Sequence, residues 1–304
     1  MFNLAHVKWF IDYEMNRDST SPIYDFSISN PAILTWISIV SVLVALAFFI
    51  HKQKPQAPKN LISWAEKHKG KFLYFFQACV GISLLFASYS GTILLPHYIG
   101  PEGSQFLHIL EGITGLLLIL NIAVPIAAVA LLITYFTTFY YFSFVEAIDY
   151  INLAGISIFL FLEKTKRFKD YKRYALPALR IFTGLALFIL AFSEKLLFQQ
   201  RAQEFLGNYE LNFMKAIGFE SYSDTFFALS AGAMEAAFGI ILILGLITRL
   251  NVLVLTGFFL ASNIFFFVQG HNQEGLVEFM GHLPIVATAI FLIAFGSGKL
   301  RKTT

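Results

Sequence analysis

Long apolar runs separated by short polar segments form the dominant pattern of the chain. The runs recur at about 18–20 residues, the length that an α-helix needs to cross ~30 Å of hydrocarbon. They lack the period-two alternation of a membrane β-barrel, and a segment in lipid must satisfy its own backbone hydrogen bonds, so each run predicts a helix. We therefore expect an all-α, polytopic membrane bundle of about nine transmembrane helices, at roughly 31–50, 72–95, 106–121, 123–142, 146–162, 177–197, 226–246, 250–268 and 277–296.

The second half of the chain repeats the first. EGITGLLLIL at Glu111–Leu120 aligns with EAAFGIILIL at Glu235–Leu244, and the segment Phe144–Leu162 aligns in the same way with Leu276–Ala294. These alignments match Glu111 with Glu235 and Glu146 with Glu278. Glutamates repeated in register within apolar sequence indicate a duplicated membrane unit.

The duplication predicts four regions. An outer N-terminal segment, a first transmembrane helix at the edge of the bundle and a basic linker occupy 1–71, and the two four-helix repeats occupy 72–162 and 177–304. A second basic linker, 163–176, joins the repeats. Because each repeat contains an even number of helices, both copies should have the same orientation in the membrane, unlike the inverted repeats of many transporters. In the first linker, Pro55 and Pro58 favour an extended path.

Charge gives the expected orientation. Only 13% of the residues are charged and 57% are hydrophobic, as in a membrane protein. Most lysines and arginines fall in segments 52–71, 164–180 and 299–302, which the predicted spans place on one side of the membrane. The positive-inside rule makes that side cytoplasmic, with the N-terminus outside and the C-terminus inside. These charges explain the net charge of +3 without a nucleic-acid partner.

Two further features limit the chemistry. The single cysteine, Cys79, excludes intrachain disulfides, a CxxC redox pair and cysteine-ligated clusters. The first residues, MFNLAHVKWFIDY, lack the apolar core of a cleavable signal peptide and instead predict a short interfacial helix.

Ionisable residues inside the predicted spans are the candidate functional residues, because burying a charge in a membrane costs several kcal/mol. Glu111 and Glu235 each precede a glycine by four residues, which directs both carboxylates toward a neighbouring helix. Glu146 and Glu278 begin the fourth helix of each repeat, with Asp149 or His282 one turn further on. The candidates for ligand binding or proton handling are Glu235, Glu278, His282, Lys195, Glu111, Glu146, Asp149 and His108.

Three interpretations of these residues are open. They form a buried hydrogen-bond network that holds the helices in register, or a protonatable or ligand-binding pocket that opens to the outer side, or a metal site. A metal fits least well, because Gly232 stands in the second copy where the first has His108, and no metal is expected. For Glu146 and Glu278, the ordinary role of an acid in a first helical turn competes with a functional one.

The second repeat resembles the DoxX/DoxD-like family of four-helix membrane proteins. The resemblance rests on Leu179, Arg180, Gly184 and Lys195 in its first helix, on GLITRL at Gly245–Leu250, and on GSGK at Gly296–Lys299, and it covers about 177–302. The first repeat is less similar, with Gly91 and Thr92 in place of Glu194 and Lys195, and Pro125 in place of Arg249. If only one half is active, we expect it to be the second.

The resemblance implies a multi-pass protein of a bacterial inner membrane. Some members of the family are membrane subunits of a thiosulfate:quinone oxidoreductase or belong to membrane complexes that handle thiol stress. The expected function is therefore a membrane subunit of a quinone-linked oxidoreductase or membrane redox complex, with quinone as the possible cofactor. The alternatives are a carrier or binding protein for a small solute or cation, and a scaffold that docks an outer protein partner on Gln199–Thr225.

Overall fold

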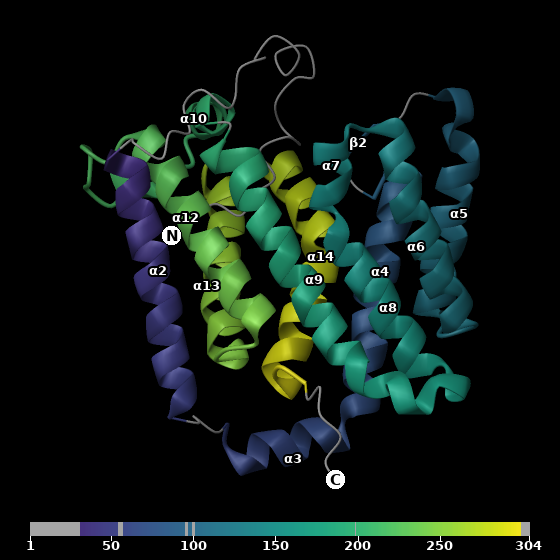
Figure 1. The fold of residues 1–304 in the computed structure, drawn as a ribbon. Coiled ribbons are helices and arrows are strands. Elements are labelled where there is room, and N and C mark those ends of the chain that lie inside the picture. Colours follow the sequence, from purple (N-terminus) through teal and green to yellow (C-terminus); the bar gives the residue numbers. More distant parts are fainter. Residues whose placement is uncertain (1–30, 54–56, 95–96, 99–100, 198, 299–304) are drawn as a thin grey trace.

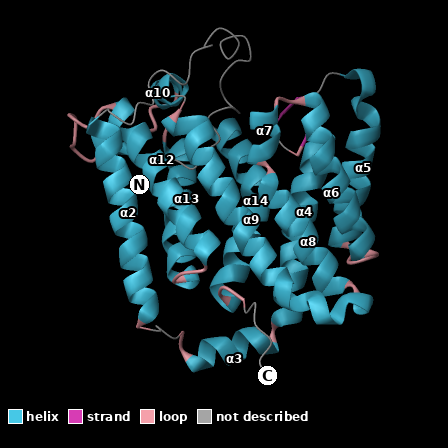
Figure 2. Ribbon diagram, viewed as in Figure 1, coloured by secondary structure: helices cyan, strands magenta, loops and turns pink. Residues whose placement is uncertain are grey.

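The protein is an all-α bundle. A computed structural model describes residues 31–53, 57–94, 97–98, 101–197 and 199–298, so the predicted interfacial helix of the first residues lies outside the described part. Figures 1 and 2 show long helices side by side, with short helices at both ends of the bundle. The only strands in the described residues are β1 (Thr92–Ile93) and β2 (His97–Tyr98), a two-residue antiparallel pair.

The helices follow the predicted apolar runs in order. The long elements are α2 (Pro31–Lys52), α4 (Lys69–Ser90), α5 (Pro101–Ile119), α6 (Val124–Tyr141), α8 (Ile151–Lys164), α9 (Ala175–Leu190), α12 (Asp224–Leu244), α13 (Thr248–Val268) and α14 (Asn272–Phe295). The short elements are α3 (Lys59–Lys67), α7 (Phe144–Asp149), the 3₁₀ segment η2 (Lys166–Tyr174), the π-helical turn η3 (Ala191–Leu196), α10 (Gln199–Asn208) and α11 (Phe213–Ala216).

The predicted number of nine spans is not exact. Within the described residues, seven helices are long and apolar enough to cross a membrane, and the apolar part of α5, Gln105–Ile119, is shorter than that. The predicted helix 146–162 is broken at Tyr150 into α7 and α8. Asp149 and Asn152 flank the break, and short polar side chains favour helix ends over helix interiors. Alone, the 14 residues of α8 rise only about 21 Å, less than the hydrocarbon thickness.

The described parts of the basic segments 52–71 and 164–180 lie together at one end of the bundle. Figure 1 shows α3 lying across this end, where α8 ends and α9 begins. The expectation of an extended first linker is wrong for its second part, because α3 forms directly after Pro58. Ala65 of α3 is fully buried, and the Trp64 ring packs edge-on against Phe72 of α4 at 5.5 Å. This packing on the bundle stabilises a helix that local sequence alone does not favour.

Glycines set the closest helix contacts. A Cβ at Gly81 of α4 would lie 2.6 Å from the carbonyl oxygen of Gly115 on α5. The same contact recurs between α9 and α12, where a Cβ at Gly184 would lie 2.8 Å from the carbonyl oxygen of Gly239. In both pairs the obstacle is backbone, so a larger residue would push the helices apart.

The two halves share one core. The rings of Phe76 on α4, Phe159 on α8 and Phe291 on α14 meet edge to face, with centroids 4.9–5.9 Å apart. All three side chains are fully buried, so α14 of the second half packs against α4 and α8 of the first. At the edge of the bundle, α2 packs beside α12 and exposes most of its apolar side chains, as expected for a helix that faces lipid.

Two arginines close helix ends at the basic side. Arg180 of α9 donates from Nη1 to the carbonyl oxygens of Leu242 and Ile243, at the C-terminus of α12. Arg249 of α13 donates to the carbonyl oxygens of Ile293 and Ala294, at the C-terminus of α14, over 3.0 and 3.2 Å. A guanidinium suits this role because helix C-termini carry unpaired carbonyls and partial negative charge. Arg180 and Arg249, two of the residues on which the family resemblance rests, therefore have a structural role.

Candidate functional site

A buried charged cluster occupies the junction of α9 and α12. Helix α9 continues directly into the π-helical segment η3. Three residues of η3, Ser193, Glu194 and Lys195, are all buried. A π-helical turn fits one extra residue into the helix and so redirects the side chains around it, which is why such turns are frequent at functional sites. The sequence analysis recognised Lys195 as a candidate but did not predict this turn.

Lys195 is held by two carboxylates. Its Nζ lies 3.0 Å from Oε2 of Glu235 on α12 and 3.6 Å from Oε2 of Glu194. The exposed fractions of these residues are 3% for Lys195 and 2% for each glutamate, so water contributes little to their solvation. Charges buried this deeply persist only when they are paired, and the cluster meets this requirement.

Gly232 makes room for the cluster. A Cβ at this position of α12 would lie 2.9 Å from Cγ of Leu196 and 3.1 Å from Cβ of Lys195. The glycine therefore lets η3 approach α12 closely enough for Lys195 to reach Glu235, one turn further along the helix. The sequence alignment, which placed Gly232 opposite His108, treated it only as the loss of a metal ligand.

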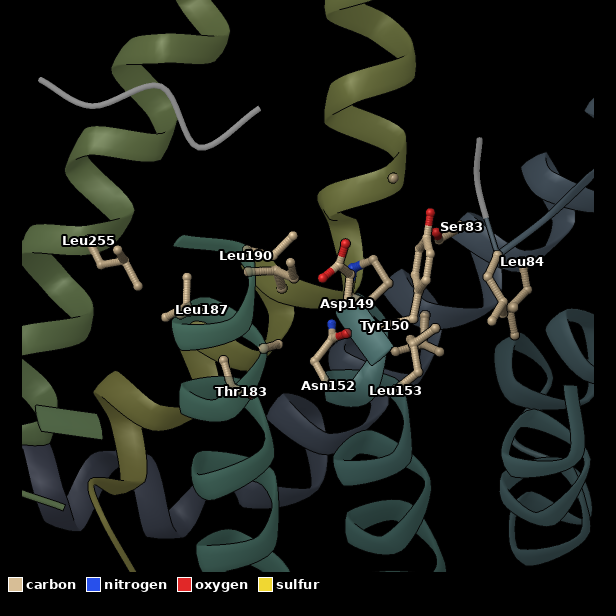
Figure 3. A pocket seen from close by; sticks show the side chains of 16 residues that line it. Ser83, Leu84, Asp149, Tyr150, Asn152, Leu153, Thr183, Leu187, Leu190 and Leu255 are labelled. Atoms are coloured by element: carbon tan, nitrogen blue, oxygen red, sulfur yellow. The ribbon is translucent and has the colours of Figure 1, made fainter. Parts of the chain in front are cut away.

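Asp149 connects the first half of the chain to this cluster. Its Oδ1 accepts a 2.8 Å hydrogen bond from Oγ of Ser193, the residue that precedes Glu194. Asp149 also lines a cavity of about 60 Å³ between α4, the α7–α8 break, α9 and α14 (Figure 3). Tyr150, Asn152 and Thr183 add polar atoms to a wall that is otherwise mainly leucine. On this measure about 10–15 Å³ is enough for one water molecule, so the cavity can hold a few waters or a very small ligand.

Glu278 and His282 form a second buried group on α14. Nδ1 of His282 lies 2.8 Å from the carbonyl oxygen of Glu278 and 3.4 Å from its Oε1. The ring of His282 also packs at 4.8 Å from that of Phe259 on α13. The prediction put Glu278 at the outer start of its helix, but α14 begins six residues earlier, at Asn272, and Glu278 is fully buried.

The first-half candidates have different surroundings. Glu111 on α5 is fully buried, and its Oε1 accepts a 2.8 Å hydrogen bond from the amide of Leu94. Glu146 instead completes a capping box with Ser143 at the start of α7, the ordinary role of an acid in a first turn. His108 is half-buried, and its carbonyl oxygen accepts from Ser88 Oγ at 2.7 Å.

The predicted patches therefore differ from the observed groups. Glu146 belongs to a helix cap, whereas Asp149 reaches across to Ser193 in the other half of the chain. Ser193, Glu194, Tyr150 and Asn152 were not among the candidate residues. In the part of the chain that the structure describes, no group of three or more His, Cys, Asp or Glu residues has the arrangement of a metal site.

Comparison with known proteins bears on the second half only. Residues 175–270 match the family model DoxX. Searches of curated proteins and of solved structures found no match. The matched region contains Glu194, Lys195 and Glu235, while Asp149, Glu278 and His282 lie outside it. The buried lysine–carboxylate cluster therefore belongs to the DoxX domain, which makes this chain a multi-pass membrane protein with a DoxX-like second half.

Proposed function

We propose that this integral membrane protein, whose second half is a DoxX domain, is the membrane subunit of a quinone-linked redox complex. In this proposal the cluster of Lys195, Glu194 and Glu235 handles protons. The observation that carries it is the burial of three ionisable side chains in contact, two on the π-helical turn η3 and one, Glu235, on the membrane-spanning helix α12. Such groups are rare in membrane interiors and usually mark proton or ligand pathways.

A nearby pocket suits an apolar ring. A pocket of about 260 Å³ lies between α2 and the face formed by α9, η3 and α12, and its lining includes Trp36, Phe188 and Phe192. Leu196 and Ala236 also line it, and they are the chain neighbours of Lys195 and Glu235. A quinone, when bound, supplies two-electron chemistry that takes up two protons on reduction. The aromatic and aliphatic wall would hold the ring, and the ion pair directly behind it would hold the protons.

The electrons would have to come from elsewhere. The chain has one cysteine, Cys79, which is buried, so it cannot form an intrachain disulfide that would accept electrons from a substrate. The proposal therefore requires a protein partner on the outer side. The segment Gln199–Thr225, which carries α10 and α11 at the end of the bundle opposite α3, is the surface that we assign to it. We also propose the orientation given by the basic segments, with the C-terminus in the cytoplasm of a bacterial cell.

The test combines ligand identification with substitution. The protein is purified in mild detergent, and mass spectrometry identifies the small molecules and proteins that co-purify. Glu235→Gln keeps the shape of the side chain and removes its charge, so we expect this variant to purify normally, to retain quinone and to lose quinone reduction when the co-purified partner protein supplies the electrons. The matched control is Glu146→Gln, because Glu146 caps a helix outside the cluster. Wild-type activity in Glu235→Gln, or absence of quinone from every preparation, contradicts the proposal.

A second candidate function rests on the central cavity. The cavity lies between the two halves, and it contains the carboxylate of Asp149 within an otherwise mainly apolar wall. Transporters built from repeats bind substrates at the repeat interface near the membrane centre, so this position favours a carrier for a small cation. Uptake of sodium or a small ammonium ion into proteoliposomes, abolished by Asp149→Asn, would support this function over the redox one.

A further inference from the structure

A second pocket lies at the basic end of the bundle, far from the cluster along the helices. It has a volume of about 290 Å³ and is formed by the end of α2, the start of α13 and the end of α14. Its polar lining residues are His51, Thr248, Arg249 and Ser297, and Ile50 and Leu250 add apolar surface. No aspartate or glutamate is among the described residues that line it.

Arg249 gives the pocket a positive charge, and its hydrogen bonds to the end of α14 use only some of its N–H donors. Its Nε and Nη2 donate to the carbonyl oxygens of Ile293 and Ala294. A guanidinium has five N–H donors in a planar fork, so donors remain on the side of Nη1. The end of α14 offsets only part of this charge, because a helix C-terminus carries about half a negative charge and the guanidinium carries a full positive one.

The start of α13 adds to this field. The helix begins after Ile247 without a side-chain cap, and the amide of Ile247 itself donates to Nδ1 of His51 at 3.3 Å. The first amides of a helix have no partner within it, and they carry about half a positive charge together. Arginine, histidine and helix terminus therefore converge on one pocket, and this combination binds phosphate in many proteins.

The position of the pocket at the end of the bundle indicates which kind of phosphate compound it binds. It lies at the ends of α2 and α14 and the start of α13, three helices long and apolar enough to span a membrane, and the apolar side chain of Leu250 is half-exposed at its edge. On the neighbouring helix α3, Trp64 is 52% exposed, and tryptophan concentrates at the level of lipid headgroups. The last turn of α2 contributes Lys52 next to His51. We propose that this pocket binds the phosphate of an anionic phospholipid, with the acyl chains along Ile50 and Leu250.

This lipid site is independent of the proposed redox function. It uses none of the buried cluster residues, so one proposal can fail without the other. Arg180 supplies a control from behind the pocket wall: it also caps a helix C-terminus and donates to the carbonyl oxygen of Ser297, but it is 5% exposed and does not itself line the pocket. Lys67, in the last turn of α3, supplies a second control for loss of one positive charge at the same end of the bundle.

The experiment measures lipid binding to the full-length protein by native mass spectrometry in mild detergent. Phosphatidylglycerol and phosphatidylcholine with identical acyl chains are titrated separately. We expect phosphatidylglycerol to bind about tenfold more tightly, and Arg249→Gln to remove this preference, because a charge-assisted hydrogen bond is lost. Arg180→Gln and Lys67→Gln should each change the affinity by about twofold or less. If Arg249→Gln does not fold, His51→Ala is measured instead, with the same expected direction.

Three results would overturn the proposal. Equal affinity for the two lipids contradicts an anionic site, and an equal loss in Lys67→Gln shows that the effect is only general surface charge. In a third arm, inorganic phosphate competes with phosphatidylglycerol. If phosphate binds in an Arg249-dependent manner while the wild-type protein shows no preference between the lipids, the pocket is a site for free phosphate and the lipid assignment is wrong.

Discussion

Replacing Lys195 with methionine tests the energetics of the buried cluster directly. The substitution keeps the length and flexibility of the side chain but removes the ammonium group that forms both ion pairs of this cluster. Glu235 then loses a partner at 3.0 Å, and Glu194 loses one at 3.6 Å. Neither carboxylate is exposed enough for water to take the place of the ammonium group.

The expected loss is large. Removing one partner of a buried ion pair costs about 3–5 kcal/mol, because the remaining charge stays buried and uncompensated. For a domain of 150–250 residues, 1 kcal/mol lowers the Tm by about 2–4 °C. Lys195→Met should therefore lower the Tm in detergent by about 6–20 °C. Adding Glu235→Leu should recover part of this loss, because the second change removes one of the two carboxylates left without the lysine.

An ion pair of the same length, with an exposed lysine and a glutamate side chain that is 10% exposed, provides the control. Lys69 Nζ also lies 3.0 Å from a glutamate oxygen, that of Glu163, but the lysine side chain is 41% exposed. Such a pair contributes about 0–1 kcal/mol, so Lys69→Met should barely change the Tm. The assay is thermal denaturation of each variant in one detergent, followed by loss of the monodisperse chromatographic peak. Equal shifts for the two lysine variants, or a double variant less stable than Lys195→Met, would refute the argument from burial.

Three other expectations are open to direct measurement. Gly184→Ala should destabilise the protein, because the new Cβ meets the backbone of α12 at 2.8 Å, whereas Gly257→Ala adds a Cβ with nothing within 4 Å and should be neutral or stabilising. Reporter fusions after Ser29 and after Thr304 should give opposite sides of the membrane, and finding both on one side would contradict the proposed topology. In an experimental structure, the halves should superpose without inversion, and an inverted relation would contradict the duplication inferred from the sequence.

The helices were predictable because membrane insertion constrains length and composition. Each predicted span has a helix at its position, since lipid permits no other way to satisfy an apolar stretch of backbone. The failures lie where tertiary contacts override this rule. The break at Tyr150 follows from side chains that bond away from their own helix, and α3 forms through packing on α4 and α14. Hydropathy carries no information about either contact.

The sequence predicted which types of residue form the candidate site, but it did not predict which of them contact each other. Buried glutamates in apolar sequence identified Glu235 and Glu278, and the cost of burial required partners for them. Lys195 was itself a candidate, and the structure places it against Glu235. The bond from Ser193 to Asp149 joins residues 44 positions apart, on helices whose neighbours depend on the packing of both halves. A contact of this kind requires the tertiary structure.

The aligned glutamates of the two halves have different surroundings. This difference predicts which half is active under the proposed function. Glu111 aligns with Glu235, but Gly91 and Thr92 stand where the second half has Glu194 and Lys195. Glu111 is instead bonded to the amide of Leu94, an acceptor role that a glutamine oxygen also fills. Glu111→Gln should therefore keep both the fold and quinone reduction, whereas Glu235→Gln removes the charge that pairs with a lysine. If Glu111→Gln abolishes activity as fully as Glu235→Gln does, the function is shared between the halves, and the lysine cluster is not its source.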